Sequence, residues 1–190
     1  KPLLPATFAL AGLLFAAGAS AELVTYNVDP THTFVTFEAS HFNTSTLRGR
    51  FDKKAGSVVI DKAAKKGEAD ITIELTSVST GVAPLDKHLM SKDFFNAEQN
   101  KTAVFKSKEI TFDGDKVSGL SGSLSMNGKD NPVMLKAARF NCYDNPMLKR
   151  EVCGGDFETT IQRSQWGIVY GLPGIPDSIR LLIQIEAIRQ

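Results

Sequence analysis

Three histidines are the side chains of this sequence best suited to proton transfer near neutral pH. They are His32, His41 and His88, and they lie far apart along the chain. None has a second histidine at the short helical spacing with which two imidazoles bind zinc. We therefore expect structural hydrogen bonding from each of them, with ligand contact, metal binding and catalysis as alternatives.

Polar residues around His88 are a second candidate for chemistry. Asp86, His88 and Asp93 could serve as an acid–base group, with Ser91 as a nucleophile. On a short helix, however, the two aspartates lie near one face and His88 points elsewhere. The sequence has no Gly-x-Ser-x-Gly turn to present a nucleophile. We expect these residues to cap and anchor a loop, and we predict that the protein is not an enzyme.

The two cysteines, Cys142 and Cys153, lie in a segment rich in Asn, Asp, Pro and Gly, which is typical of a loop. In an oxidising compartment an even cysteine count favours a disulfide. Closing a loop of this size would stabilise the fold by about 3 kcal/mol. A metal site would need further ligands, and the segment contains no histidine. We predict a Cys142–Cys153 disulfide and no metal site.

The first 21 residues have the pattern of a cleavable signal peptide. Lys1 is followed at 7–17 by an apolar run that is short for a membrane span, and residues 19–21 (Ala-Ser-Ala) fit a cleavage site. We expect export to the periplasm and one mature domain, residues 22–190. A retained membrane anchor is the alternative.

Charge is evenly balanced after this cleavage. The full chain has 22 Lys and Arg against 21 Asp and Glu, and cleavage removes one lysine. The basic spots at 53–54, 62 and 65–66 lie among turn residues, as solvated loop charges do. This distribution lacks the positive footprint of a nucleic-acid-binding protein, so we expect no nucleic-acid partner.

Alternation of polar and apolar residues dominates the mature sequence and predicts strands that are buried on one face. The alternation is strict at 70–75 and 157–162 and longest at 179–187. Further strands are expected at 33–39, 57–61, 103–107, 117–126 and 132–138.

Turn residues connect these expected strands. Asp113-Gly114 and Asn127-Gly128 favour tight hairpins because both residue types tolerate positive φ, so the sheet should be mainly antiparallel. Residues 83–90 depart from the pattern and predict a short helix with proline near its start, after which Ser91 caps a further helical turn. About eight strands fit either a sandwich or a closed barrel.

Several sequence blocks carry a family resemblance. The most specific is Asp-Lys-His-Leu-Met-Ser-Lys-Asp-Phe-Phe at 86–95. The others are Tyr-Asn-Val-Asp-Pro-Thr-His-Thr-Phe-Val-Thr-Phe at 26–37, His-Phe at 41–42, Gly-Arg-Phe at 49–51, Ser-Val-Ser-Thr-Gly at 77–81, Ala-Val-Phe-Lys-Ser at 103–107, the strand-turn-strand unit at 117–133, Ile-Gln-Arg-Ser-Gln-Trp-Gly-Ile at 161–168 and Pro-Asp-Ser-Ile at 176–179. Together they resemble the YceI-like, or polyisoprenoid-binding, family over essentially the whole mature chain.

The resemblance implies an all-β fold, an eight-stranded antiparallel lipocalin-like barrel with a short helix between strands. It also implies one long-chain isoprenoid lipid, such as a quinone or a prenyl phosphate, held inside as ligand, with no other cofactor. Such a chain binds by leaving water, at about 0.8 kcal/mol per buried CH₂. A homodimer and transient contact with membrane redox proteins are further partner hypotheses.

Apolar residues of the expected strands and loops are the candidates for the cavity wall. They are Val35, Phe37, Phe42, Phe51, Ile73, Leu75, Phe94, Phe95, Phe105, Leu124, Trp166, Ile168, Leu181 and Ile183. At the cavity mouth, His32, His41 and His88 are candidates for headgroup contact. Two alternatives stay open: an enzyme that acts on a lipid with His32 or His88 as base, and a solid barrel that binds only other proteins.

Overall fold

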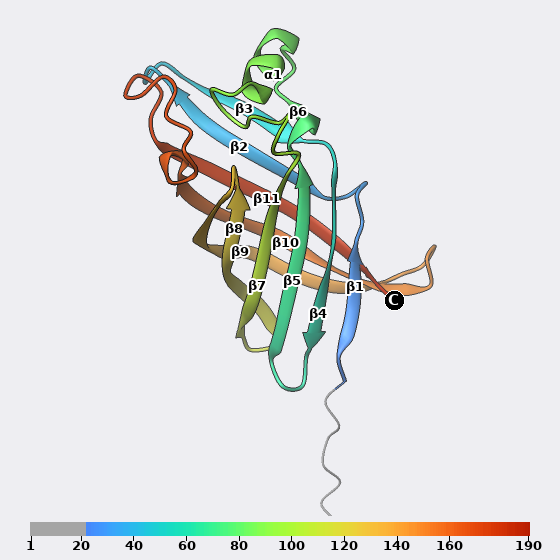
Figure 1. Cartoon of the computed structure of the whole chain (residues 1–190). Helices are drawn as coiled ribbons and strands as arrows, with labels where there is room; N and C mark the ends of the chain where they lie inside the picture. The colour runs from blue at the N-terminus through green and yellow to red at the C-terminus, as the bar shows by residue number, and fades with distance from the viewer. Residues whose placement is uncertain (1–21) are drawn as a thin grey trace, which may run out of the picture.

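The computed structural model describes residues 22–190, and the expected signal peptide at 1–21 lies outside them. The described chain is built mainly from strands (Figure 1). Its elements are β1 (Val24–Val28), β2 (Phe34–His41), β3 (Ser45–Phe51), β4 (Lys54–Asp61), β5 (Lys66–Glu74), the 3-10 helix η1 (Leu75–Ser77), β6 (Val78–Ser79), α1 (Ala83–Met90), β7 (Thr102–Asp113), β8 (Lys116–Met126), β9 (Lys129–Asn145), β10 (Arg150–Gln162), the 3-10 helix η2 (Arg163–Trp166) and β11 (Ser178–Arg189).

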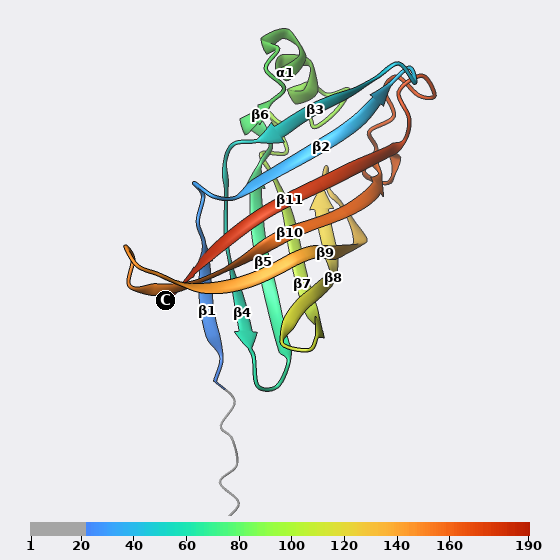
Figure 2. The ribbon, with the colours of Figure 1, turned by 180° about the vertical axis from the view of Figure 1, so that it is seen from behind.

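Eight strands close into a ring in the order β1-β4-β5-β7-β8-β9-β10-β11, with β11 returning to β1. All neighbours in the ring are antiparallel, so the predicted eight-stranded barrel is confirmed and the sandwich is excluded. Closure rests on three residue pairs, between 26–28 and 187–189. The other half of β11 pairs with β2, which extends the wall through β3 and β6 (Figures 1 and 2).

The break between β1 and β2 has a local cause. Asp29 precedes proline and its carboxylate accepts hydrogen bonds from the amide and hydroxyl of Thr31, at 2.8 and 2.6 Å, which forms a tight turn. The buried Thr33 hydroxyl then donates to the Glu186 carbonyl and accepts from the Glu186 amide. This side chain therefore satisfies main-chain groups of β11 where the strand ladder is interrupted.

Two hairpin turns join the central strands. Asn127 and Gly128 form a two-residue turn with φ values of 51° and 69°, as expected for this pair. The β7–β8 turn lies one residue later than expected, at Gly114–Asp115, and Asp113 instead pairs with Lys116 as the last residue of β7.

The cysteine segment is a hairpin of two long strands, which corrects the expectation of a loop. Cys142 on β9 lies directly opposite Cys153 on β10, and a disulfide joins them as predicted. Only residues 146–149 form the turn. Gly154 lies in β10, where a Cβ atom would be 2.3 Å from the Ile185 carbonyl oxygen of β11. Glycine is therefore needed here because the two strands approach closely, and it does not mark a loop.

The helix α1 covers residues 83–90 as predicted and lies across one end of the barrel (Figure 1). Leu89 is its buried residue. The further helical turn expected after Ser91 is a series of tight turns, in which the Ser91 carbonyl accepts from the amides of Phe94 and Asn96. Among residues 22–190, no helix is long and apolar enough to cross a bilayer.

Candidate functional site

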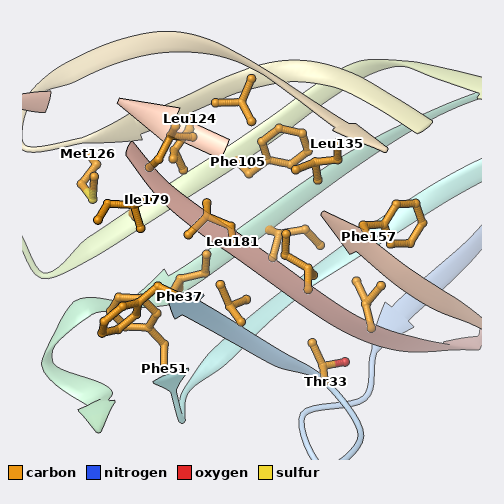
Figure 3. Close-up of a pocket in the computed structure, with 18 of the residues that line it drawn as sticks. Thr33, Phe37, Phe51, Phe105, Leu124, Met126, Leu135, Phe157, Ile179 and Leu181 are labelled. Carbon is orange, nitrogen blue, oxygen red and sulfur yellow. The ribbon is translucent and has the colours of Figure 1, made fainter. Parts of the chain in front are cut away.

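The interior of the barrel contains a cavity of about 260 Å³. One buried water requires only about 10–15 Å³ of such space, so the interior is not filled by side chains. In Figure 3, Phe37, Phe105, Leu124 and Leu181 point into this common space from β2, β7, β8 and β11. The barrel therefore encloses room for an apolar guest.

Strand register explains why the wall is apolar. Val35 and Phe37 of β2 lie opposite Ile183 and Leu181 of β11, so all four side chains share the inner face. On the other side of β2, Phe37 is paired with Gly49. A Cβ atom at Gly49 would lie 2.3 Å from the Phe37 ring, so this glycine makes room for the ring.

Most of the expected wall residues line this cavity. They are Val35, Phe37, Phe51, Ile73, Leu75, Phe94, Phe95, Phe105, Leu124, Ile168, Leu181 and Ile183. They come from β2, β3, β5, β7, β8 and β11, from η1, and from the segments that follow α1 and η2. The alternation pattern therefore identified inward-facing residues of β2, β5 and β11.

Phe42 and Trp166 lie outside the lining, which differs from the expectation. Phe42 follows β2 in the turn to β3, where its side chain is 62% exposed and packs against Gly174. Trp166 is only 1% exposed, but it lies in η2 and its indole donates to the Leu124 carbonyl at 2.9 Å. The Phe42 ring therefore faces solvent, and the Trp166 ring is held by a hydrogen bond to the main chain of β8.

The cavity opens beside His41, which is exposed to solvent and also lines the interior. Ser40, Leu85 of α1 and Ile175 line the cavity with it. The mouth is therefore bordered by the β2–β3 turn, by α1 and by the loop 167–177 that connects η2 to β11 (Figures 1 and 2).

The other two histidines lie outside the cavity lining. The His32 ring is exposed, with its Nδ1 atom 2.7 Å from Asp29 Oδ2, and this hydrogen bond raises the pKa of His32. His88 packs edge-on against the rings of Phe94 and Tyr170, at centroid distances of 5.0 and 4.9 Å. The structure therefore does not bring the three histidines together.

The structure brings together only part of the acid–base group considered around His88. Asp86 accepts hydrogen bonds from the Thr80 amide and hydroxyl at 2.7 and 2.6 Å, so it anchors the segment before α1. Asp93 Oδ2 lies 3.5 Å from His88 Nε2. The Ser91 hydroxyl accepts from the Asp93 amide, as a capping residue does.

Arg163 is a buried cation that the sequence did not identify. Its guanidinium donates to the carbonyl oxygens of Ile168, Ile175 and Pro176 at 3.2, 2.9 and 3.0 Å. Burial lowers the pKa of Arg163, and the Asp177 carboxylate opposes that shift. Arg163 therefore ties together the two ends of the loop at the mouth. Its position before a loop rich in Gly and Pro was the available signal.

A polar cluster lies beside the cavity wall at Tyr26 of β1. Tyr26 lines the cavity, and its hydroxyl donates to Glu151 at 2.5 Å, while Lys62 Nζ lies 2.8 Å from the same carboxylate. Burial and the bond to Glu151 raise the pKa of Tyr26. Because Tyr26 and Glu151 are 125 residues apart in the chain, no local pattern could have paired them.

Sequence comparison decides the family. A profile described as the YceI-like domain matches residues 26–187. The chain belongs to the YceI-like family. It is similar to a UPF0312 protein of Pseudomonas aeruginosa, with 35% identity over 188 residues and 97% of each chain covered. It is also similar to Protein YceI of Escherichia coli O157:H7, with 34% identity over 193 residues, covering 100% of this chain and 98% of that one.

Solved structures share the fold of this YceI-like chain. BcnA of Burkholderia cenocepacia superposes with a TM-score of 0.69 at 23% identity, covering 84% of this chain and 99% of that one. A polyisoprenoid-binding domain from Saccharophagus degradans gives a TM-score of 0.65 at 16% identity, covering 89% and 100%. At these identities the likeness shows the barrel architecture.

Proposed function

We propose that this YceI-like protein holds one long-chain isoprenoid lipid, such as a quinone or a prenyl phosphate, in its barrel and carries it through the periplasm. The observation that carries the proposal is the apolar cavity, which is lined from all sides of the barrel and opens at one end beside His41. The Saccharophagus degradans neighbour, described as polyisoprenoid-binding, supports the same ligand class.

Apolar burial supplies the affinity in this proposal. Each CH₂ group that leaves water contributes about 0.8 kcal/mol, so a long chain needs apolar walls and no reactive group. The polar end of the lipid then lies at the mouth, where His41 offers a hydrogen-bonding imidazole. The protein acts as a binding protein, and pairing of two copies and contact with membrane redox proteins stay predictions.

Mass spectrometry of an organic extract tests the proposal. The protein is purified from the periplasm without detergent, and we expect about one isoprenoid lipid per chain. The same sample reports the mature N-terminus, which we expect at Glu22. Protein that carries no lipid and also fails to take up added quinone or prenyl phosphate would contradict the carrier function.

A matched pair of variants connects the lipid to the cavity. Ala39 lines the cavity near its mouth, so Ala39→Phe should obstruct the chain and lower the lipid content. Ala55 is exposed on β4, so Ala55→Phe adds the same ring outside the cavity and should leave the lipid content unchanged. Urea denaturation shows that both variants are folded. Equal lipid in both variants would place the ligand elsewhere.

A further inference from the structure

Large apolar side chains are exposed around the cavity mouth. Phe42 is 62% exposed and Val169 is 57% exposed, and Tyr170 and Leu172 are exposed beside them in the loop 167–177. We call these four residues the apolar rim. Singly exposed apolar residues are common on proteins, whereas a group of them around an opening marks an interaction surface.

Contacts across the mouth join the rim into one surface. The Phe42 ring packs against Gly174, which connects the β2–β3 turn to the loop 167–177. Tyr170 packs against Phe94 at a centroid distance of 5.4 Å, which connects the same loop to the segment after α1. The rim therefore extends over the elements that border the opening.

The rim is continuous with the cavity wall. Ile168 lines the cavity while its neighbour Val169 faces solvent. In the same way His41 lines the cavity and its neighbour Phe42 faces solvent. An apolar chain that leaves the cavity would therefore meet apolar surface before it meets water.

Both segments that carry the rim lack charged side chains. Residues 39–47 and 164–176 contain no Asp, Glu, Lys or Arg. By contrast, the exposed Met147 is followed by Lys149 and Arg150. One cation lies beside the loop, since a Cβ atom at Gly167 would lie 3.5 Å from Lys129 Nζ. The four rim side chains themselves are uncharged and can enter the headgroup region of a bilayer without the cost of dehydrating ions, and tyrosine is well suited to that interface.

We propose that the apolar rim docks on the surface of a lipid bilayer, so that the isoprenoid chain passes between bilayer and cavity without crossing water. The inference rests on the proposed carrier function, because a cargo of this class is otherwise dissolved in the bilayer. A bilayer fits the rim because the rim is continuous with the cavity and its four side chains are uncharged and largely apolar.

Vesicle flotation and lipid transfer test the docking. Vesicles of phosphatidylethanolamine and phosphatidylglycerol, loaded with a quinone, are mixed with the mature protein. The rim variant is Phe42→Asn with Val169→Ser, because asparagine tolerates the φ of 49° at position 42. The control is Met134→Ser with Met147→Ser, two apolar residues that are even more exposed, at 70% and 86%, but lie on β9 and in the β9–β10 turn, outside the rim.

We expect wild type and control to float with the vesicles and to take up quinone at similar rates. The rim variant should bind vesicles and take up quinone about tenfold more weakly, as expected for a loss of one to two buried apolar contacts. Urea midpoints show that the variants are folded. Equal flotation and equal uptake in all three proteins would overturn the docking.

A soluble short-chain quinone separates this inference from the carrier function. Without vesicles, the rim variant should bind it as wild type does, because the cavity lining is unchanged. Failure of wild type to bind it would overturn the carrier function, and flotation would then decide the docking alone. A wild-type dimer that the rim substitutions convert to a monomer, without vesicle binding, would overturn the docking in favour of a second copy of the chain.

Discussion

The indole N–H of Trp166 donates to the main-chain carbonyl of Leu124 at 2.9 Å, and this bond fixes η2 against β8. Trp166→Phe removes this hydrogen bond and shrinks a ring that is 1% exposed. We expect the free energy of unfolding to fall by about 1–3 kcal/mol, measured in urea. Affinity for a soluble short-chain quinone should stay unchanged, because Trp166 does not line the cavity. Lost affinity at unchanged stability would contradict this assignment.

Arg163 should control how firmly the loop at the mouth is held. Lysine has one nitrogen and cannot reach the three carbonyl groups that the guanidinium bonds. In Arg163→Lys we expect faster amide hydrogen exchange over 167–175 and a loss of about 1–3 kcal/mol in stability. Arg139→Lys, at an exposed ion pair with Asp156, is the matched control and should change neither quantity. Identical exchange in both variants would count against the role of Arg163.

Reduction of the Cys142–Cys153 disulfide should lower stability and preserve the fold. The chain-entropy model gives a loss of about 3 kcal/mol for a loop of this length. The cysteines remain opposite each other in the ladder of β9 and β10, so the hairpin should keep its strand structure. Urea unfolding with and without reductant measures the difference, and circular dichroism reports the strands. A large loss of β signal on reduction alone would contradict this expectation.

The Asp29–His32 pair should make the stability of the protein depend on pH, and the pKa shifts of the two residues fix the direction of that dependence. Partial burial tends to raise the pKa of Asp29, but hydrogen bonds from His32 and Thr31 outweigh it and hold the pKa at about 2. Because this value is below that of the unfolded chain, the contribution of Asp29 to stability is present above about pH 4 and is lost as the pH falls towards 2.

The contribution of His32 to stability changes with pH in the opposite direction. The bond to Asp29 raises its pKa, so its contribution is present at acidic pH and is lost as the pH rises through the raised value. In Asp29→Asn, the pKa of His32 measured by NMR should fall. The stability deficit of the variant, up to about 1 kcal/mol at pH 5, should shrink near pH 2. An unchanged pKa of His32 would show that the pair does not form in solution.

His41 should matter for ligands that carry a polar headgroup. It lines the cavity at the mouth, so His41→Ala removes a hydrogen-bonding group there. We expect about fivefold weaker binding of a soluble short-chain quinone, which corresponds to about 1 kcal/mol. His32→Ala removes the same ring from the outer surface and should bind normally. Titration calorimetry compares the two variants, and equal affinities would remove His41 from the site.

Much of the barrel could be predicted from the sequence because strand burial has a period of two residues. The alternation at 179–187 placed Leu181 and Ile183 on one face, and both line the cavity. Closure into a ring came from the family resemblance, because alternation alone also fits a sandwich. The strand β3 was not predicted, since Ser45, Thr46, Arg48 and Arg50 make it polar and exposed.

The mouth was harder to predict than the wall. Neighbouring residues at the mouth point in different directions: His41 lines the cavity, whereas Phe42 faces solvent. Which of the two faces inward depends on how three separate segments fold over one end of the barrel. Trp166 looked like a wall residue because it is large and apolar, but its indole bonds a carbonyl 42 residues away. Contacts of that range have no local sequence pattern.

The seam between β1 and β11 has a practical consequence for protein engineering. The Arg189 side chain pairs with Glu22 at 3.0 Å and the Gln190 amide donates to the Thr25 carbonyl, so the C-terminal end lies beside β1, far from the mouth (Figures 1 and 2). A short linker between residues 22 and 190, with new ends cut at the exposed Gly114–Asp115 turn, would give a circularly permuted barrel with the same ring of strands. A reporter fused at that end would leave the opening clear.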